Sequence, residues 1–245
     1  MIRIQNGRVY DPVNNWNGDV RDVYYEDGVI AAPPQGTQEI ETFDAGGCAV
    51  LAGGIDPHAH IAGEPLALLR DAGDPAVPSD WTLGREYANM GYTLAVNAAA
   101  PALAARHTLA EENAIPLLDT ANLIWVGENP ALLELAKNGS DEELDQYVSW
   151  LLAVSGGWGL KLINPREGEP DGELPYAQLI ERLLAANERL NLPHALHLHH
   201  PYLCRADAYT SVTETMARAE GRRLHLAHLQ FYGYRRDAEG RTYSA

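Results

Sequence analysis

The sequence predicts an α/β fold: an incomplete (β/α)8 barrel with about six β/α units, preceded by a small N-terminal β unit. From Cys48 onward, short apolar runs alternate with helical patterns, which is typical of parallel βαβ units. The preceding stretch instead has short β-type runs separated by turn residues. We therefore expect two domains, a small β-sandwich-like unit at 1–47 and a partial barrel at 48–245 that carries the candidate site.

The small unit is predicted from three β-type runs, at 1–9, 20–25 and 29–30. The turn at 26–28 joins the last two and ends in glycine, as hairpin turns often do. These runs favour a small antiparallel sheet.

The barrel is predicted from six apolar runs that read as strands. Eight strands are needed to close such a barrel, usually within roughly 250 residues. The sequence ends shortly after the sixth run, so we expect the chain to be truncated by two units. The predicted strands are 49–55, 93–97, 122–126, 159–163, 195–199 and 224–229.

Two of the intervening helices carry further signals. The helix predicted at 141–154 follows Ser140, a preferred N-cap residue, and stops at two glycines. The helix predicted at 175–191 has a leucine-rich stripe at helical spacing. Both patterns predict helices that pack one apolar face against the sheet.

Composition excludes several classes of function. The chain has 18 basic and 34 acidic residues, and its formal charge of −16 argues against nucleic acid binding and against binding to anionic membranes. No apolar run approaches the ~20 residues that span a bilayer, so no membrane insertion is expected. Cys48 and Cys204 form no CxxC pair, which fits a cytoplasmic protein.

A His-x-His pair, His58 and His60, follows the first predicted barrel strand. Side chains two residues apart on a strand point to the same side, so the two imidazoles can bind one metal ion. Functional residues of such barrels lie at the carboxyl ends of strands, and imidazole is a common ligand of zinc. This position favours a metal site over a solvent-facing pair of histidines.

Two further strand ends carry histidines. His197 and His199 alternate onto one face of the predicted fifth strand. His225 and His228, three residues apart on the sixth, should point to opposite faces, so only one is expected to face the barrel interior. We expect this one to be His228, because it is nearer the strand end.

Lys161 lies in the middle of the apolar run 159–163. A buried lysine is costly unless it is paired or neutral. A neutral amine can react with carbon dioxide, and the resulting carbamate can bridge two metal ions. A lysine that extends to solvent or pairs with an acid is the alternative, which the surrounding histidines disfavour. We therefore expect a carboxylated Lys161.

These features together resemble the amidohydrolase superfamily of metal-dependent (β/α)8 barrels, which includes dihydroorotases and hydantoinases. Further stretches resemble the A subunits of formylmethanofuran dehydrogenase and of its methylotroph counterpart, the formyltransferase/hydrolase complex. The resemblance covers essentially the whole chain. The stretches that carry it are 86–93, 99–101, 106–108, 126–129, 197–199 and 225–231.

The resemblance implies two divalent metal ions, usually zinc, and chemistry at a formamide. The metal ions polarise the formyl carbonyl for attack by hydroxide, and Lys161 and His228 are the expected catalytic residues. For the fifth strand we prefer His199 over His197. The metal ligands expected are His58, His60, carboxylated Lys161, His199 and His228.

The resemblance also implies the substrate and the partners. The substrate would be a formylated methanofuran-type carrier that is hydrolysed to formate, or formate in the reverse reaction. The partners would be B-, C- and D-type subunits and, in the methylotroph complex, a formyltransferase.

One expected residue is missing from the sequence. The resemblance implies an aspartate at the end of the eighth strand, as metal ligand and proton shuttle, but only six strands are predicted. Asp237 follows the sixth predicted strand in a polar loop and is a poor substitute. We therefore do not expect this chain to be a complete enzyme.

Two alternatives remain open. The chain could be another cyclic-amide hydrolase, such as a dihydroorotase or hydantoinase, although the stretches 126–129 and 228–231 speak against this. It could instead be a non-catalytic or truncated scaffold subunit. The missing aspartate favours a scaffold, whereas the retained histidines and Lys161 favour an enzyme.

Overall fold

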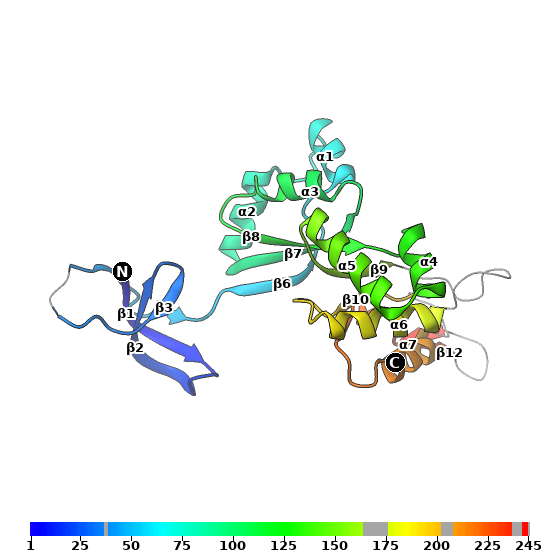
Figure 1. Cartoon of the computed structure of the whole chain (residues 1–245). Coiled ribbons are helices and arrows are strands. Elements are labelled where there is room, and N and C mark those ends of the chain that lie inside the picture. The colour runs from blue at the N-terminus through cyan, green and yellow to red at the C-terminus, as the bar shows by residue number, and fades with distance from the viewer. Residues whose placement is uncertain (37–38, 164–175, 202–207, 237–241, 245) are drawn as a thin grey trace. The chain divides into compact units, whose positions relative to one another are not determined.

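The computed structural model describes the chain except residues 37–38, 164–175, 202–207, 237–241 and 245 (Figure 1). Cys204 and Asp237 therefore lie outside the described residues. The chain forms two compact units, Met1–Gly54 and Ile55–Ala245.

The first unit is a five-stranded sheet organised around its first strand. β1 pairs antiparallel with β2, and β2 with β3, as the turn at 26–28 predicts. On its other edge β1 pairs in parallel with both β4 and β5, which the sequence did not indicate. The chain approaches itself closely there, since a Cβ at Gly7 would collide with Val50. The strands are β1 (Ile2–Asp11), β2 (Trp16–Glu26), β3 (Val29–Ala31), β4 (Glu41–Asp44) and β5 (Ala49–Val50).

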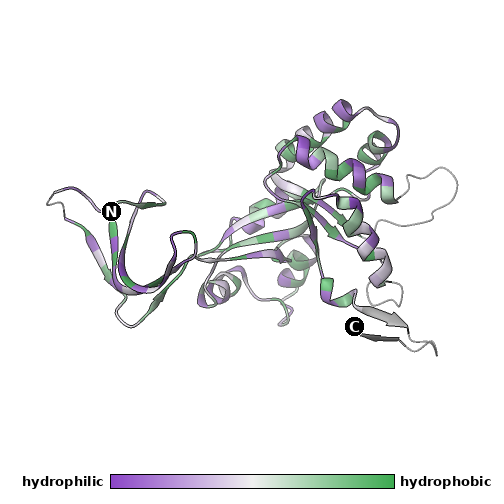
Figure 2. Cartoon of the chain, turned by 90° about the horizontal axis from the view of Figure 1, so that it is seen from below, coloured by the Kyte–Doolittle hydropathy of each residue, from purple (hydrophilic) through white to green (hydrophobic). Residues whose placement is uncertain are grey.

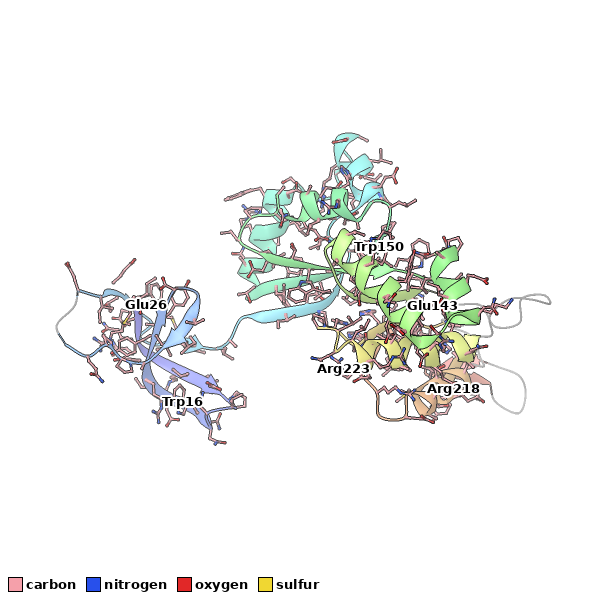
Figure 3. The ribbon with its side chains drawn as sticks, viewed as in Figure 1. Trp16, Glu26, Glu143, Trp150, Arg218 and Arg223 are labelled. Carbon is pink, nitrogen blue, oxygen red and sulfur yellow. The ribbon has the colours of Figure 1, made fainter. Side chains whose placement is uncertain are left out.

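Side chains on this sheet add one contact between β1 and β2 and one within β2. The Arg3 guanidinium donates to Asp22 at 2.6 Å, which links β1 to β2. The Arg21 guanidinium lies 4.7 Å from the centre of the Trp16 ring, and Trp16 is labelled in Figure 3. Both contacts lie on a partly exposed surface, where solvent screens them, so each adds little to the stability of the sheet.

The second unit is built on a six-stranded sheet with the strand order β11-β10-β9-β8-β7-β6. The pairings from β7 to β11 are all parallel. A predicted first strand at 49–55 is wrong, because Ala49 and Val50 pair with β1 and the barrel strand begins at Gly54. The strands are β6 (Gly54–Ala59), β7 (Tyr92–Pro101), β8 (Asp119–Trp125), β9 (Gly157–Ile163), β10 (Leu196–His199) and β11 (Leu224–Leu226); β12 (Tyr234–Arg236) and β13 (Thr242–Ser244) form a separate pair.

Helices connect successive strands and pack on the sheet. Contacts join α2 and α3 to β7, α3 also to β8, α5 to β9 and α6 to β10, which is the arrangement of a (β/α) barrel. The helices are α1 (Glu64–Asp71), α2 (Asp80–Asn89), α3 (Ala105–Glu112), α4 (Pro130–Asn138), α5 (Asp141–Ser155), α6 (Tyr176–Arg189) and α7 (Ala208–Ala219), with a 3-10 turn η1 (Leu229–Phe231) after β11.

The two helices with the strongest sequence signals are confirmed. α5 begins at a capping box in which Ser140 and Glu143 satisfy each other's backbone N–H groups, and it ends at Gly156 in the left-handed conformation. α6 buries the predicted leucine stripe, including Leu183 and Leu184, both at 0% exposure. Local caps and periodicity therefore determine these two helices.

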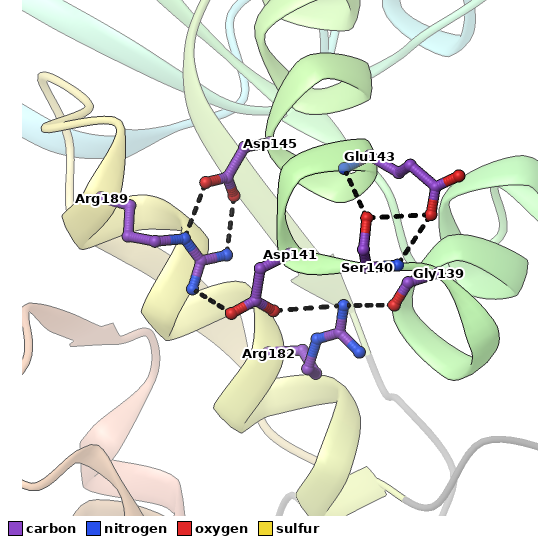
Figure 4. Close-up of polar contacts among 7 residues, drawn as sticks. All are labelled: Gly139, Ser140, Asp141, Glu143, Asp145, Arg182 and Arg189. Carbon is purple, nitrogen blue, oxygen red and sulfur yellow. Dashed lines mark hydrogen bonds and ion pairs between the residues drawn. The ribbon is translucent and has the colours of Figure 1, made fainter.

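A surface ion-pair network joins α5 to α6 (Figure 4). Arg189 makes two hydrogen bonds of 2.7 Å to Asp145 and a third of 3.2 Å to Asp141. Arg182 reaches Asp141 at 3.3 Å and the Gly139 carbonyl at 2.9 Å. The paired geometry at Asp145 is the strongest arrangement for such contacts, although exposed pairs contribute at most about 1 kcal/mol each.

Two more arginines attach α6 to its neighbours (Figure 3). Arg218 of α7 donates to Glu181 at 2.9 Å, and Arg223 donates to Glu188 at 3.0 Å just before β11. The first contact holds α6 to α7, and the second holds it to the start of β11.

The main core lies between the sheet and its helices. In β9, Leu160 and Leu162 are both 0% exposed and pack with Leu144 and Val148 of α5. Apolar and polar residues alternate along the helices of this unit (Figure 2), so each helix has an apolar face to contribute. The intervening residues of each strand point to the opposite face of the sheet.

The sheet is strongly curled. Six strands spaced about 4.8 Å apart in a flat sheet would hold its edge strands roughly 24 Å apart. The rings of His58, on β6 at one edge, and His228, just after β11 at the other, have centroids only 4.6 Å apart. The curl brings the two edges toward each other, and the incomplete barrel predicted from the sequence is confirmed.

Among the described residues, every helix is too short or too polar to cross a lipid bilayer.

Candidate metal centre

Lys161 is buried on the face of β9 that points away from the helices. Only 1% of the residue is exposed, and its Nζ has no hydrogen-bond partner among the described residues. Its neighbours Leu160 and Leu162 face the helices, so strand alternation turns the lysine inward. Burial lowers the pKa of Lys161 to about 7, so a large share of the amine is neutral at neutral pH.

Three inward-facing residues lie in register across adjacent strands. Lys161 of β9 pairs with His197 of β10, which in turn pairs with His225 of β11. His197 is 0% exposed, and its ring stacks on that of His225 with centroids 4.1 Å apart. This row places two imidazoles beside the buried amine.

The His-x-His pair approaches this row from the opposite edge of the sheet. His58 lies within β6 and His60 directly follows it, with ring centroids 5.1 Å apart. The His58 ring is also 4.9 Å from His197 and 4.6 Å from His228. Because β6 and β11 are the edge strands, the curl of the sheet is what assembles the cluster.

Both histidines of the sixth strand reach the cluster. The ring of His228 contacts those of His58 and His199, while His225 stacks on His197. The expectation that only one of them would face inward is wrong. β11 ends at Leu226, and His228 adopts a left-handed conformation (φ 58°), so the two-residue alternation no longer applies.

His199 completes the residues predicted from the sequence. Its ring centroid is 4.8 Å from that of His228, which in turn lies beside His58. The structure thus brings His58, His60, His199 and His228 into one chain of ring contacts near Lys161. Their assignment as metal ligands stays a prediction.

The site favours neutral imidazoles. Burial lowers the pKa of His58 to about 3 and of His199 to about 4, and it lowers the pKa values of His60 and His228 as well. The positive charge of Lys161 adds to the effect at all four. A neutral imidazole is the form that binds metal ions, so these four side chains are in the metal-binding form at neutral pH.

The donor set fits a metal centre. Nε2 of His58 and Nζ of Lys161 are both buried and have no hydrogen-bond partner among the described residues. Native proteins rarely leave buried polar atoms unsatisfied, so each such atom calls for a partner. Metal ions together with a carbamate on Lys161 would satisfy both atoms.

A second histidine group lies beside this one and was not predicted. His194, His197 and His225 each offer a ring nitrogen, and these nitrogens lie within 4.8 Å of one another. His194 precedes β10, so the strand pattern gave no signal for it. His225 was excluded by the alternation that breaks down after Leu226.

Two residues that the sequence did not single out hold the His58 backbone. Asp56 Oδ1 accepts a hydrogen bond of 3.0 Å from the His58 N–H, and Tyr87 of α2 donates to Asp56 Oδ2 at 2.9 Å. Asp56 could have been noticed two residues before His58. Tyr87 could not, because only the tertiary fold brings α2 to this strand.

No family model matches the chain. Over 96% of its length, it is 37% identical to the A-type component of the formyltransferase/hydrolase complex Fhc of Methylorubrum extorquens. Over 94% of its length, it is 32% identical to Protein FwdA of Methanocaldococcus jannaschii. The chain is a homologue of these two proteins. It spans about half the length of both, 48% in each case.

Solved structures agree. The chain superposes with a TM-score of 0.89 and 35% identity on the formyltransferase/hydrolase complex FhcABCD of Methylorubrum extorquens in complex with methylofuran, covering all of this chain and 50% of that one. A beta-aspartyl dipeptidase from Fervidobacterium islandicum, at 16% identity and a TM-score of 0.53 over 93% of this chain and 59% of that one, shares the fold alone. The predicted incomplete (β/α) barrel is confirmed as the fold.

A shorter match covers only part of the chain. Over 62 residues, or 24% of this chain and 14% of the relative, it is 47% identical to a dihydroorotase of Solibacter usitatus. The aspartate expected on an eighth strand has no counterpart in the described sheet, which has six strands.

Proposed function

We propose that this chain forms the metal-binding part of a hydrolase that acts on the formamide of a formylated methanofuran-type carrier. The observation that carries the proposal is the unpartnered Nζ of buried Lys161 among inward-facing histidines. Homology to FwdA and to the Fhc component, whose complex was solved with methylofuran, supports the substrate class. The alternative direction, condensation of formate with the carrier amine, uses the same site.

We assign the metal ligands as the sequence predicted them. His58, His60, His199 and His228 would bind two divalent ions, with zinc the preferred metal for imidazole and carboxylate donors. The neutral amine of Lys161 attacks carbon dioxide, which forms a carbamate N–C bond and releases the amine proton. The carbamate carries the negative charge that the neutral imidazoles lack.

The chemistry follows from this donor set. When bound, the metal ions polarise the formyl carbonyl and supply the nucleophile for hydrolysis. In the net reaction water adds to the formyl carbon, the C–N bond breaks, and formate and the carrier amine leave. His228 lies between His58 and His199, where we place it next to the reacting group.

The same homology suggests the partners of the protein. We propose B-, C- and D-type subunits as partners, together with a formyltransferase activity, because the matched structure is an FhcABCD complex. A cytoplasmic location stays a prediction.

The test compares two substrates and the chain's two lysines, Lys137 and Lys161. The full-length protein is assayed for formate release from the formylated carrier and for opening of dihydroorotate. We expect formate release by the wild type and by Lys137→Met, and at least a 100-fold loss in Lys161→Met, as expected for loss of a metal-bridging group.

Two results would contradict the proposal. Turnover of dihydroorotate but not of the formylated carrier would instead support a cyclic-amide hydrolase, which the 62-residue match favours locally. Equal activity of Lys161→Met and the wild type would show that Lys161 takes no part in the reaction. A non-catalytic scaffold is disfavoured because a buried unpaired lysine destabilises a core that an apolar residue would fill better.

A further inference from the structure

We infer that His197 is a positioning residue: it accepts a hydrogen bond from Nδ1–H of His58 and so leaves Nε2 of His58 free for a metal ion. The inference rests on the proposed function in one respect, that His58 holds a metal. It concerns a residue outside the predicted ligand set.

The contact between the two rings is direct and buried. Nδ1 of His58 and Nε2 of His197 are 2.8 Å apart, with ring centroids 4.9 Å apart. His197 is 0% exposed, so bulk water does not compete for the contact. A neutral imidazole has one donor nitrogen and one acceptor nitrogen, so one ring donates and the other accepts.

The direction of this hydrogen bond decides which nitrogen can bind a metal. If His58 donates from Nδ1, its Nε2 carries a free lone pair. If His197 donates from Nε2, His58 carries its proton on Nε2 and cannot bind a metal there. Each arrangement leaves one buried N–H without a partner among the described residues, on Nδ1 of His197 in the first and on Nε2 of His58 in the second, so the choice between them depends on which nitrogen binds a metal.

The position of the His197 proton also decides whether the group His194, His197 and His225 can bind a metal. Nδ1 of His197 is also buried without a partner among the described residues, and it could bind a metal only if His197 carried its proton on Nε2. Metal binding at both rings would leave two protons facing each other across 2.8 Å. With neutral rings, therefore, a metal on His58 Nε2 and a metal on His197 Nδ1 exclude each other.

The surroundings favour the metal on His58. His58 belongs to a His-x-His pair and lies near Lys161, whose carbamate would supply an anionic ligand. The alternative group consists of three imidazoles and has no carboxylate among its members. A divalent ion is bound more strongly where negative charge is available. His197 thus takes the part that a carboxylate or a backbone carbonyl usually plays behind a metal-binding histidine.

The experiment compares three variants of the full-length protein: His197→Gln, His197→Leu and His194→Gln. The side-chain carbonyl of glutamine can accept the His58 N–H, whereas leucine cannot. His194→Gln is the matched control, because His194 stacks on His197 while its Nδ1 contacts a backbone carbonyl. Zinc content is measured by elemental analysis, and zinc affinity by competition with a chromophoric chelator.

We expect zinc affinity to fall by about 10- to 100-fold in His197→Leu, the range found when such outer partners are removed. His197→Gln should recover most of this loss, and His194→Gln should match the wild type in both content and affinity. In the wild type labelled with ¹⁵N-histidine and loaded with zinc, Nδ1 of His58 should carry a proton and Nε2 should bear the metal.

Several outcomes would overturn the inference. Equal zinc loss in His197→Gln and His197→Leu would make His197 itself a ligand. Loss of one zinc ion in His194→Gln would place a metal in the group His194, His197 and His225. A His58 proton on Nε2 in the zinc-loaded wild type would contradict it directly. If the wild-type protein bound zinc on His58 Nε2 but released no formate, the proposed function would be contradicted. The inference about His197 would still hold.

Discussion

The two faces of the barrel sheet differ sharply although they share the same strands. On the helix-facing side of β9, Leu160 and Leu162 pack in a dry apolar core. On the other side, Lys161 is equally buried and its amine has no partner among the described residues. Apolar packing on the helix-facing side stabilises the sheet and offsets the destabilising burial of Lys161 on the other side. Substitutions on the two faces should therefore change stability in opposite directions.

The largest expected effect is a gain of stability on the inner face. In metal-free, carbon dioxide-free protein, Lys161→Met should raise the unfolding free energy below pH 7. The pKa of Lys161 is about 7 in the fold and about 10.5 when unfolded, a difference worth on the order of 5 kcal/mol. The measurement is chemical unfolding of wild type and variant at several pH values.

The pH dependence of wild-type stability determines where Lys161→Met should have its largest advantage. Between pH 7 and 10.5 the unfolded chain binds a proton that the folded chain does not, so wild-type stability rises with pH. The advantage of Lys161→Met should therefore be largest below pH 7 and should shrink toward pH 10.5. If the stability difference between Lys161→Met and the wild type did not change with pH, folding would not lower the pKa of Lys161.

A smaller effect of opposite sign is expected on the helix-facing side. Leu162→Ala should destabilise the barrel unit by about 2–5 kcal/mol, because it removes apolar contacts and leaves a cavity. Leu103→Ala is the matched control, since Leu103 is fully exposed and should change stability by no more than about 0.5 kcal/mol. Both are measured by urea unfolding, and similar values for the two variants would refute the assigned packing.

The helix-facing side was the more predictable of the two from sequence. The strands around Leu160 and Ile124, the cap at Ser140 and the stripe of α6 are local patterns, and the structure reproduces them. The first barrel strand was misplaced because 49–50 pairs with β1, and sequence alternation cannot show which sheet an apolar run joins.

For the inner face, the sequence predicted which residues are present but not all of the contacts between them. The spacing of His58 and His60 and the burial of Lys161 follow from strand alternation. The contact between His58 and His197 depends on the curl of six strands, which joins residues 139 positions apart. The left-handed conformation at His228 likewise overrides the alternation that had excluded His225.

The most direct test of the proposed metal centre is whether Lys161 carries a carbamate. The full-length protein would be loaded with zinc under ¹³C-labelled carbon dioxide and examined by ¹³C NMR, beside Lys161→Met and Lys137→Met. We expect a carbamate signal in the wild type and in Lys137→Met, and none in Lys161→Met. A zinc-loaded wild type without that signal, or a signal that persists in Lys161→Met, would contradict the proposed centre.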